Sequence, residues 1–289
     1  MFNFFTGTMN VIEAFVLGII QGVTEFLPIS SSGHLALAKI LIGSDVESGI
    51  TYEVVVHFGT LVSIIYYYRT ELGRLFTSGV CFLLNPGKEK DSKDVRFLGM
   101  VLTSMIPASI VGFTLKDQIE AIFSNPLLVS FMLLITGILL FSTKFVPKRI
   151  EDYDISYGSA QKSTASIGIA KSFTIGLAQA FAMIPGISRS GSTITTALWL
   201  GIDRDTAANF SFIMVIPVIA GAMFLQVLDL VEFGIQEAAL QVLFVGFLSS
   251  TMSGYFALKY LIIILKKSGF HLFSFYCWAV GLLGVWLFV

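Results

Sequence analysis

The sequence predicts an all-α polytopic membrane protein built as an inverted-topology repeat. Two observations carry this prediction: an apolar composition with runs of membrane-spanning length, and a polar break that occurs twice. Of the 289 residues, 55% are hydrophobic and 13% are charged, and the mean hydropathy is +0.83. A helix needs roughly 20 apolar residues to cross the hydrocarbon core, and several stretches approach that length. We therefore expect residues 1–289 to form a single membrane domain in contact with lipid.

The balance of charges excludes one broad class of partner. The chain has 18 basic and 19 acidic residues and a formal net charge of −1 at pH 7. Binding of nucleic acid depends on a clear excess of positive charge, which this chain lacks. The sequence gives no reason to expect a nucleic-acid partner.

Up to six apolar runs, long and nearly free of charge, are interpreted as simple membrane spans. They are residues 53–68, 97–115, 126–143, 211–230, 240–265 and 270–289. Two further segments, 11–42 and 169–200, are interrupted by Pro, Gly and Ser. At bilayer depth such breaks leave backbone groups unsatisfied unless they face protein or water. We expect each segment to be a re-entrant pair of broken helices.

The charged connections orient the predicted spans. Basic residues are concentrated in the 69–96 and 144–171 connections, which the positive-inside rule places in the cytoplasm. The 116–125 and 229–239 connections carry mainly acidic residues and are expected outside. On this topology both termini lie outside.

The two broken segments are copies of one another. Residues 18–45, "GIIQGVTEFLPISSSGHLALAKILIGSD", align without gaps with residues 176–203, "GLAQAFAMIPGISRSGSTITTALWLGID". Each copy precedes three spans, and because three is odd, the second copy must enter the membrane from the opposite side. This predicts repeat 1 over about 1–145 and repeat 2 over about 169–289, joined by the cytoplasmic linker of about 144–171. In such proteins the discontinuous helices of both halves meet near the midplane and form the site.

Three ionisable residues, Glu25, His34 and Arg189, lie in these breaks. A Ser- and Gly-rich turn alone could simply allow close helix packing and cap helix ends. Ionisable groups inside membrane segments are costly, however, and they usually mark functional sites. The alternative interpretation of Arg189 is a structural partner for a buried carboxylate such as Glu25.

The residue types at the breaks suit chemistry on a diphosphate. Arginine presents a fixed fork of donors to phosphate oxygens, and backbone N–H groups at helix starts bind anions. Gln21 and Glu25 are four apart on one helix face, and their oxygens are hard ligands for Mg²⁺ or Ca²⁺. A serine hydroxyl in the 30–32 stretch lies close to His34 in sequence. This supplies the nucleophile and base that covalent phosphoryl transfer requires.

At these positions the chain resembles a known family. "QGVTEFLPISSSGH" (21–34) is similar to the acidic motif and serine-histidine stretch of the undecaprenyl-diphosphatase, or bacitracin-resistance, family, and "PGISRSGST" (185–193) is similar to its second motif. The resemblance implies hydrolysis of undecaprenyl diphosphate to undecaprenyl phosphate and inorganic phosphate, which recycles the lipid carrier of cell-wall synthesis. It also implies a divalent cation and a site in the bacterial plasma membrane that opens to the extracytoplasmic face.

The resemblance assigns a role to each matching position. Glu25, Ser31, His34 and Arg189 fall on its catalytic residues, with Ser31 as nucleophile and Arg189 on the phosphate. Gln21 replaces a glutamate found in many members, so Glu25 carries more of the metal-binding role. The substrate-binding residues predicted from the two motifs are Ser30, Ser32, Gly33, Ser188, Ser190, Gly191 and Thr193.

Other assignments stay open at this level. His57, on the 53–68 span, could extend the site, but a lone helical histidine is more often a packed residue. A transporter or flippase of a polyprenyl phosphate or another anion has the same inverted-repeat plan. It would need Arg189 and hydrogen-bond donors, but not Ser31 beside His34. The sequence leaves the oligomeric state open, a homodimer included.

Overall fold

The computed structural model describes residues 9–42, 49–85, 87, 92–123, 125–147, 167–233, 240–267 and 269–289. Within these ranges the regular structure is helical, without a strand. Among the described residues, four helices are long and apolar enough to cross a membrane: Lys93–Thr114, Pro126–Phe145, Leu240–Lys266 and Phe270–Phe288. The chain is therefore a multi-pass membrane protein, as its composition predicts.

The helices follow the predicted runs closely. The first half contains α1 (Val11–Phe26), α2 (Ser31–Ile42), α3 (Gly49–Tyr67), α4 (Arg69–Leu84), α6 (Lys93–Thr114), α7 (Lys116–Phe123) and α8 (Pro126–Ser142). The second half contains α9 (Ile169–Phe181), α10 (Arg189–Trp199), α11 (Arg204–Phe233), α12 (Leu240–Lys266) and α13 (Phe273–Phe288). Both predicted breaks are present, because each broken segment is a helix, a short turn and a second helix.

Local sequence explains where the broken helices begin and end. Asn10 caps α1 through a capping box. Its side chain accepts from the backbone N–H of Glu13, and the Glu13 carboxylate accepts from the backbone N–H of Asn10. The helix ends at Phe26, and Leu27, directly before Pro28, is extended because proline disfavours the helical conformation in the preceding residue. These residues place the first break near the centre of the molecule.

The paired helices approach closely through small residues. α1 packs along α12, and α9 packs along α6. A Cβ at Gly22 would lie 2.5 Å from the carbonyl oxygen of Ser250, and one at Gly176 would lie 2.3 Å from that of Ser104. Larger side chains would separate these helices. Close packing of this kind substitutes for the hydrophobic effect, which does not drive helix association in lipid.

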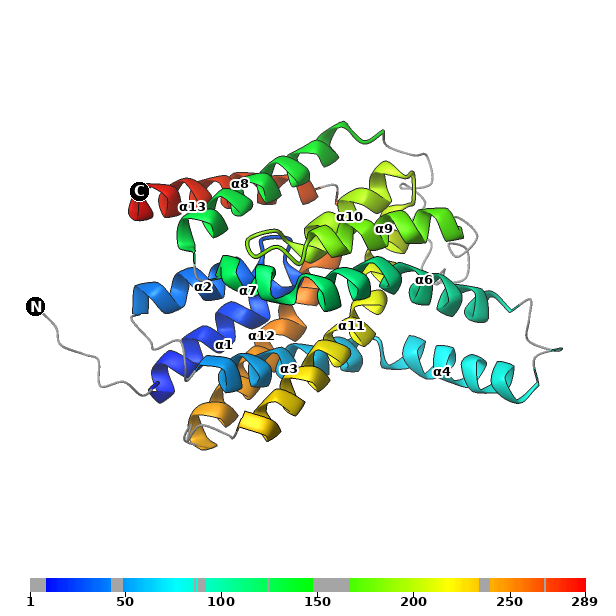
Figure 1. Cartoon of the computed structure of the whole chain (residues 1–289). Coiled ribbons are helices and arrows are strands. Elements are labelled where there is room, and N and C mark those ends of the chain that lie inside the picture. Colours follow the sequence, from blue (N-terminus) through cyan, green and yellow to red (C-terminus); the bar gives the residue numbers. More distant parts are fainter. Residues whose placement is uncertain are drawn as a thin grey trace, which may run out of the picture.

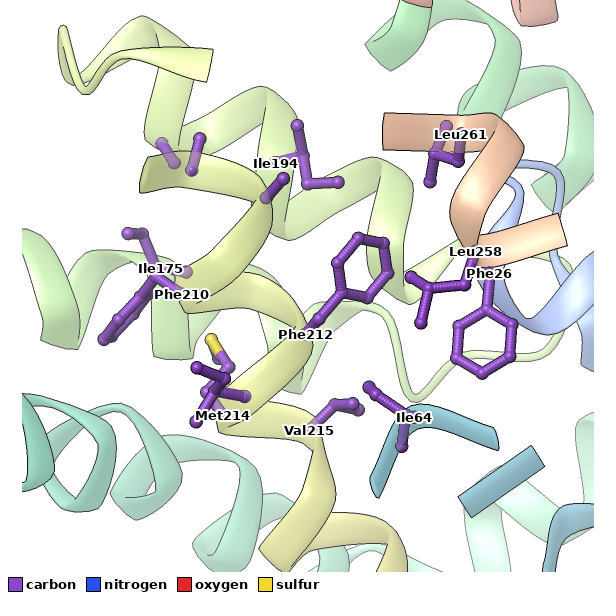
Figure 2. Packing of buried hydrophobic residues seen from close by; sticks show 14 of the residues in the cluster. Phe26, Ile64, Ile175, Ile194, Phe210, Phe212, Met214, Val215, Leu258 and Leu261 are labelled. Atoms are coloured by element: carbon purple, nitrogen blue, oxygen red, sulfur yellow. The ribbon is translucent and has the colours of Figure 1, made fainter. Parts of the chain in front are cut away.

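The two broken pairs occupy opposite parts of the molecule. In Figure 1, α1 and α2 lie on the left, α9 and α10 lie on the right, and the turn of each pair faces the centre. Apolar side chains fill the space beside this meeting point. Figure 2 shows Phe26, Ile64, Phe212 and Leu258 facing one another, and the rings of Phe26 and Phe212 are 6.1 Å apart. This cluster fixes the end of α1 against α3, α11 and α12.

Two connections differ from the sequence prediction. The 69–96 connection contains helix α4, and the 116–125 connection contains the short helix α7. Because of its charges, the 69–96 segment was interpreted as a cytoplasmic connection, and its helix was not predicted. Its buried Leu75 joins the hydrophobic core, and α4 packs on α6. Residues 148–166 and 234–239, in the other predicted connections, lie outside the described residues, and the inverted orientation of the repeats stays a prediction.

Candidate active site

Glu25 lies at the centre of the candidate site, in the last turn of α1. Its side chain is 3% exposed, and Oε1 lies 2.5 Å from Nη2 of Arg189, the first residue of α10. The two residues are far apart in sequence, one in each broken segment. A buried carboxylate needs such a partner, because desolvation of an unpaired charge is costly. The sequence allowed a structural alternative for Arg189, an ion pair with Glu25. This ion pair is present.

The second oxygen of this carboxylate binds two further residues of the first motif. Ser31 Oγ donates to Glu25 Oε2 at 2.6 Å, and Gln21 Nε2 donates to the same oxygen at 3.0 Å. Hydrogen bonds to an ionised acceptor are shorter and stronger than neutral ones. Ser31 therefore has its hydroxyl proton directed at a carboxylate that can accept it.

An unusual backbone conformation at Ser30 positions Ser31. Ser30 has φ of +72°, a left-handed conformation that non-glycine residues rarely adopt. Its hydroxyl accepts from Gly33 N–H at 3.2 Å and lies 3.2 Å from Ser32 Oγ. Strained residues of this kind are concentrated at functional sites. The turn makes Ser31 the first residue of α2, next to the end of α1.

The second motif forms a similar turn. Ser188 caps α10 by accepting from Gly191 N–H at 3.1 Å, and its hydroxyl lies 3.4 Å from that of Ser190. Thr193 donates to the carbonyl of Arg189 at 3.0 Å. These contacts orient the start of α10, where the backbone N–H groups and the helix dipole favour an anion.

The two turns touch directly, and α8 holds the second one in place. Ser32 Oγ accepts from Gly186 N–H at 3.5 Å, and Ser190 Oγ donates to the carbonyl of Leu27 at 3.5 Å. Thr136 of α8 donates to the carbonyl of Gly186 at 2.9 Å and accepts from Ser188 N–H at 3.0 Å. The prediction that both breaks meet is confirmed.

His34 contacts other groups than the sequence predicts. Its Nδ1 donates to the carbonyl of Ser30 at 2.8 Å, and its Nε2 lies 2.9 Å from the hydroxyl of Tyr276, on which the ring also stacks. The expected pairing of a serine hydroxyl with His34 is therefore replaced, since the Ser31 hydroxyl donates to Glu25. Proximity along the first turn of α2 does not ensure that two side chains point at one another.

Two residues beside the site were not predicted as site residues from the sequence. His57 Nε2, from α3, lies 3.9 Å from Glu25 Oε2, and Tyr276, from α13, binds His34. The sequence could have indicated a role for His57, because it is an ionisable residue within a predicted span. It could not have indicated one for Tyr276, which is one of many aromatic residues in apolar helices.

The described residues were compared with the ligands that a divalent metal ion requires. Among the described residues, no group of three or more His, Cys, Asp and Glu side chains gathers as a metal site. Gln21 is fully buried, however, and within the described part of the chain its Oε1 has no hydrogen-bond partner. A buried amide oxygen and a neighbouring carboxylate are hard oxygen ligands. Such ligands bind Mg²⁺ together with the phosphate oxygens of a substrate. The residues present fit a divalent cation that is completed by the substrate.

Comparison with known proteins shows the family of this chain. Residues 14–283 match the family described as bacitracin resistance protein BacA. The chain belongs to this family. Its relatives include proteins named undecaprenyl-diphosphatase from Halothermothrix orenii, 38% identical over 95% of this chain and 97% of the relative, and from Geobacter metallireducens, 39% identical over 97% and 99%. A third, from Methanobrevibacter smithii, is 36% identical over 95% and 96%. Members of the BacA family thus share nearly the whole length of this chain.

Proposed function

We propose that this protein hydrolyses undecaprenyl diphosphate to undecaprenyl phosphate and inorganic phosphate, recycling the lipid carrier of cell-wall polymers. Membership of the BacA family supports this reaction, and removal of the diphosphate accounts for resistance to bacitracin. The observation that carries the proposal is the Glu25 carboxylate, which contacts the Ser31 hydroxyl from one broken segment and the Arg189 guanidinium from the other. A nucleophile, a base and a phosphate-binding cation converge there.

The first chemical step is attack by Ser31. Its Oγ bonds to the terminal phosphorus, the bond from that phosphorus to the bridging oxygen breaks, and undecaprenyl phosphate leaves. Glu25 takes the hydroxyl proton, for which the 2.6 Å contact is already formed. Water then attacks the phosphoserine, releases inorganic phosphate and restores the Ser31 hydroxyl, while Glu25 returns its proton. The role of His34 on this route is to bind the diphosphate or protonate the leaving oxygen.

Arg189 couples substrate binding to this step. Its guanidinium pairs with Glu25, and a diphosphate entering the site competes for the same fork of donors. As Arg189 turns towards phosphate, Glu25 Oε1 is released from the ion pair, while Oε2 keeps its contact with the Ser31 hydroxyl. Arg189 then opposes the charge that spreads over the transferring phosphoryl group. The hydroxyls and N–H groups of Ser30, Ser32, Gly33, Ser188, Ser190, Gly191 and Thr193 supply the remaining binding groups.

A divalent cation, Mg²⁺ or Ca²⁺, completes the proposed site. Gln21 and Glu25 would hold it together with diphosphate oxygens. When bound, it supplies positive charge that polarises the phosphoryl oxygens. The buried Gln21 Oε1 supports this assignment.

The proposed topology is the inverted repeat, with the 144–171 linker in the cytoplasm and the site open to the extracytoplasmic face of the cell membrane. The exchange of packing partners between the halves, α1 on α12 and α9 on α6, supports it. All proposed site residues come from one chain. Single cysteines at Lys144 and Gln118, in a Cys81→Ser/Cys277→Ser background, should react with impermeant reagents from opposite sides. Labelling of both from one side contradicts the inverted repeat.

The experiment that tests the function uses full-length protein purified in detergent. Phosphate released from undecaprenyl diphosphate is measured with Mg²⁺ and with a chelator. We expect release with Mg²⁺ and strongly reduced release with chelator. No release under either condition contradicts hydrolysis and favours a transporter of the lipid phosphate.

A further inference from the structure

His57 is the one imidazole beside Glu25 that neither sequence motif contains. It projects from α3, and its side chain is 28% exposed, whereas that of Glu25 is 3% exposed. Its Nδ1 lies 2.8 Å from the carbonyl oxygen of Glu53. A carbonyl only accepts, so Nδ1 carries the hydrogen. With Nδ1 as the donor, Nε2 is the ring nitrogen that faces Glu25, and it can bind a metal ion through its lone pair.

The distance between the His57 and Glu25 side chains distinguishes a direct hydrogen bond from shared binding of a metal ion. His57 Nε2 and Glu25 Oε2 are 3.9 Å apart, which is too long for a hydrogen bond. Two ligands of one metal ion, with bonds of about 2.1 Å that open at a wide angle, lie up to about 4 Å apart. Metal-binding histidines also usually donate their other ring N–H to a carbonyl or carboxylate. His57 has both features.

Gln21 also contacts this carboxylate oxygen and brings an amide group to the same place. Its Nε2 lies 3.0 Å from Glu25 Oε2, while its Oε1 is buried and, among the described residues, unpartnered. Rotation of the amide by half a turn would bring the oxygen to the carboxylate. Two such oxygens repel each other unless a cation lies between them. A metal ion would thus bind the Gln21 amide oxygen, which has no hydrogen-bond donor among the described residues.

We propose that His57 Nε2 is a ligand of the divalent cation, together with Glu25 and Gln21. This inference rests on the cation of the proposed function and adds a nitrogen ligand from a helix outside both motifs. Oxygen-only sites suit Mg²⁺ and Ca²⁺, whereas imidazole favours transition metals. The site should accordingly bind Mn²⁺ more tightly than Mg²⁺ or Ca²⁺.

Electron spin-echo spectroscopy of Mn²⁺ tests the bond itself. Mn²⁺ is added below one equivalent to the purified full-length protein, and modulation from a coordinated imidazole ¹⁴N is measured. We expect this modulation in the unmodified protein, its loss in His57→Gln, and its retention in His34→Gln. The His57→Gln protein should also lose at least about tenfold in Mn²⁺ affinity. Thermal melting of both variants verifies that they are folded.

The outcomes separate this inference from the proposed function. Bound Mn²⁺ without nitrogen modulation, or modulation lost only in His34→Gln, overturns the assignment of His57, and a protein that still releases phosphate keeps its proposed function. In that case His57 is an ion-pair partner of Glu25. Failure of the unmodified protein to bind Mn²⁺ also overturns the inference. Conversely, modulation that depends on His57 in a protein that releases no phosphate would refute the hydrolase alone.

Discussion

The two broken segments share a local structure but differ in the chemistry they carry. Ser30 and Ser188 occupy equivalent positions and accept from the equivalent N–H groups of Gly33 and Gly191, at 3.2 and 3.1 Å. The next position is Ser31 in one copy and Arg189 in the other, and both side chains bind Glu25. The duplicated turn thus presents a hydroxyl on one side of a carboxylate and a guanidinium on the other.

A further difference between the copies lies in the helix before each turn. Glu25 corresponds to Met183, while Gln21 is retained as Gln179, which is buried and, within the described residues, makes no side-chain hydrogen bond. The second copy therefore has the polar position without the carboxylate. On the proposed mechanism, this single carboxylate distinguishes the copy that performs proton transfer.

The largest effect is expected at the first turn. Ser31→Ala removes the proposed nucleophile, so turnover should fall by roughly three or more orders of magnitude. Ser253→Ala is the matched control, because its hydroxyl bonds only within α12, and its turnover should stay within about twofold. Phosphate release by both purified variants measures the effect. Near-normal turnover in Ser31→Ala would assign the attack to water or to His34.

The second turn should show a smaller effect. Arg189→Lys keeps the positive charge but loses the paired N–H donors of the guanidinium. Turnover should therefore fall about a hundred- to a thousandfold, and the turnover of Arg189→Ala should be lower still. Arg69→Lys, an exposed arginine outside the site, should retain full turnover.

Thermal melting separates the two roles of Arg189. If it served only as the structural partner of Glu25, the substitution would leave a buried charge unpaired and lower stability by about 3–5 kcal/mol. A melting temperature that drops in step with activity would refute the catalytic assignment. Normal melting with heavily reduced turnover would support it.

A still smaller effect is expected at the contact between α2 and α13. Tyr276→Phe removes the hydroxyl that binds His34 Nε2 but keeps the ring stacked on it. The loss of one hydrogen bond, about 1 kcal/mol, should lower turnover roughly fivefold. Tyr260→Phe, at an exposed ring, provides the control. Equal turnover in the two variants would show that this hydroxyl does not orient His34 for the reaction.

The smallest effect distinguishes the two serine caps. Ser30 has φ of +72°, whereas Ser188 has φ of −75°. Ser30→Gly relieves backbone strain, so stability should stay constant or rise by up to about 1 kcal/mol. Ser188→Gly relieves none and should lower stability by a few tenths of a kcal/mol. Both are measured by denaturation in detergent, and equal shifts would contradict the difference in strain.

The sequence predicts the helices well, because lipid requires long apolar segments and tolerates breaks only where they face protein. It also places Glu25 and Arg189 in the breaks. Side-chain directions could not be predicted, since they depend on packing between helices distant in sequence. The approach of α3 brings His57 to Glu25, and that of α13 brings Tyr276 to His34. Helix α4 was missed because its charges resemble those of a cytoplasmic loop.

On the proposed mechanism, one turn supplies the attack while Arg189 of the other binds the diphosphate. Direct binding of undecaprenyl diphosphate to Ser31→Ala and to Ser31→Ala/Arg189→Ala tests it without turnover. Arg189 should contribute to binding and Ser31 should not. We expect Ser31→Ala to bind tightly and the double variant to bind about a hundredfold more weakly, a difference of about 2.7 kcal/mol. Equal affinity of the two variants would contradict the division of chemistry between the copies.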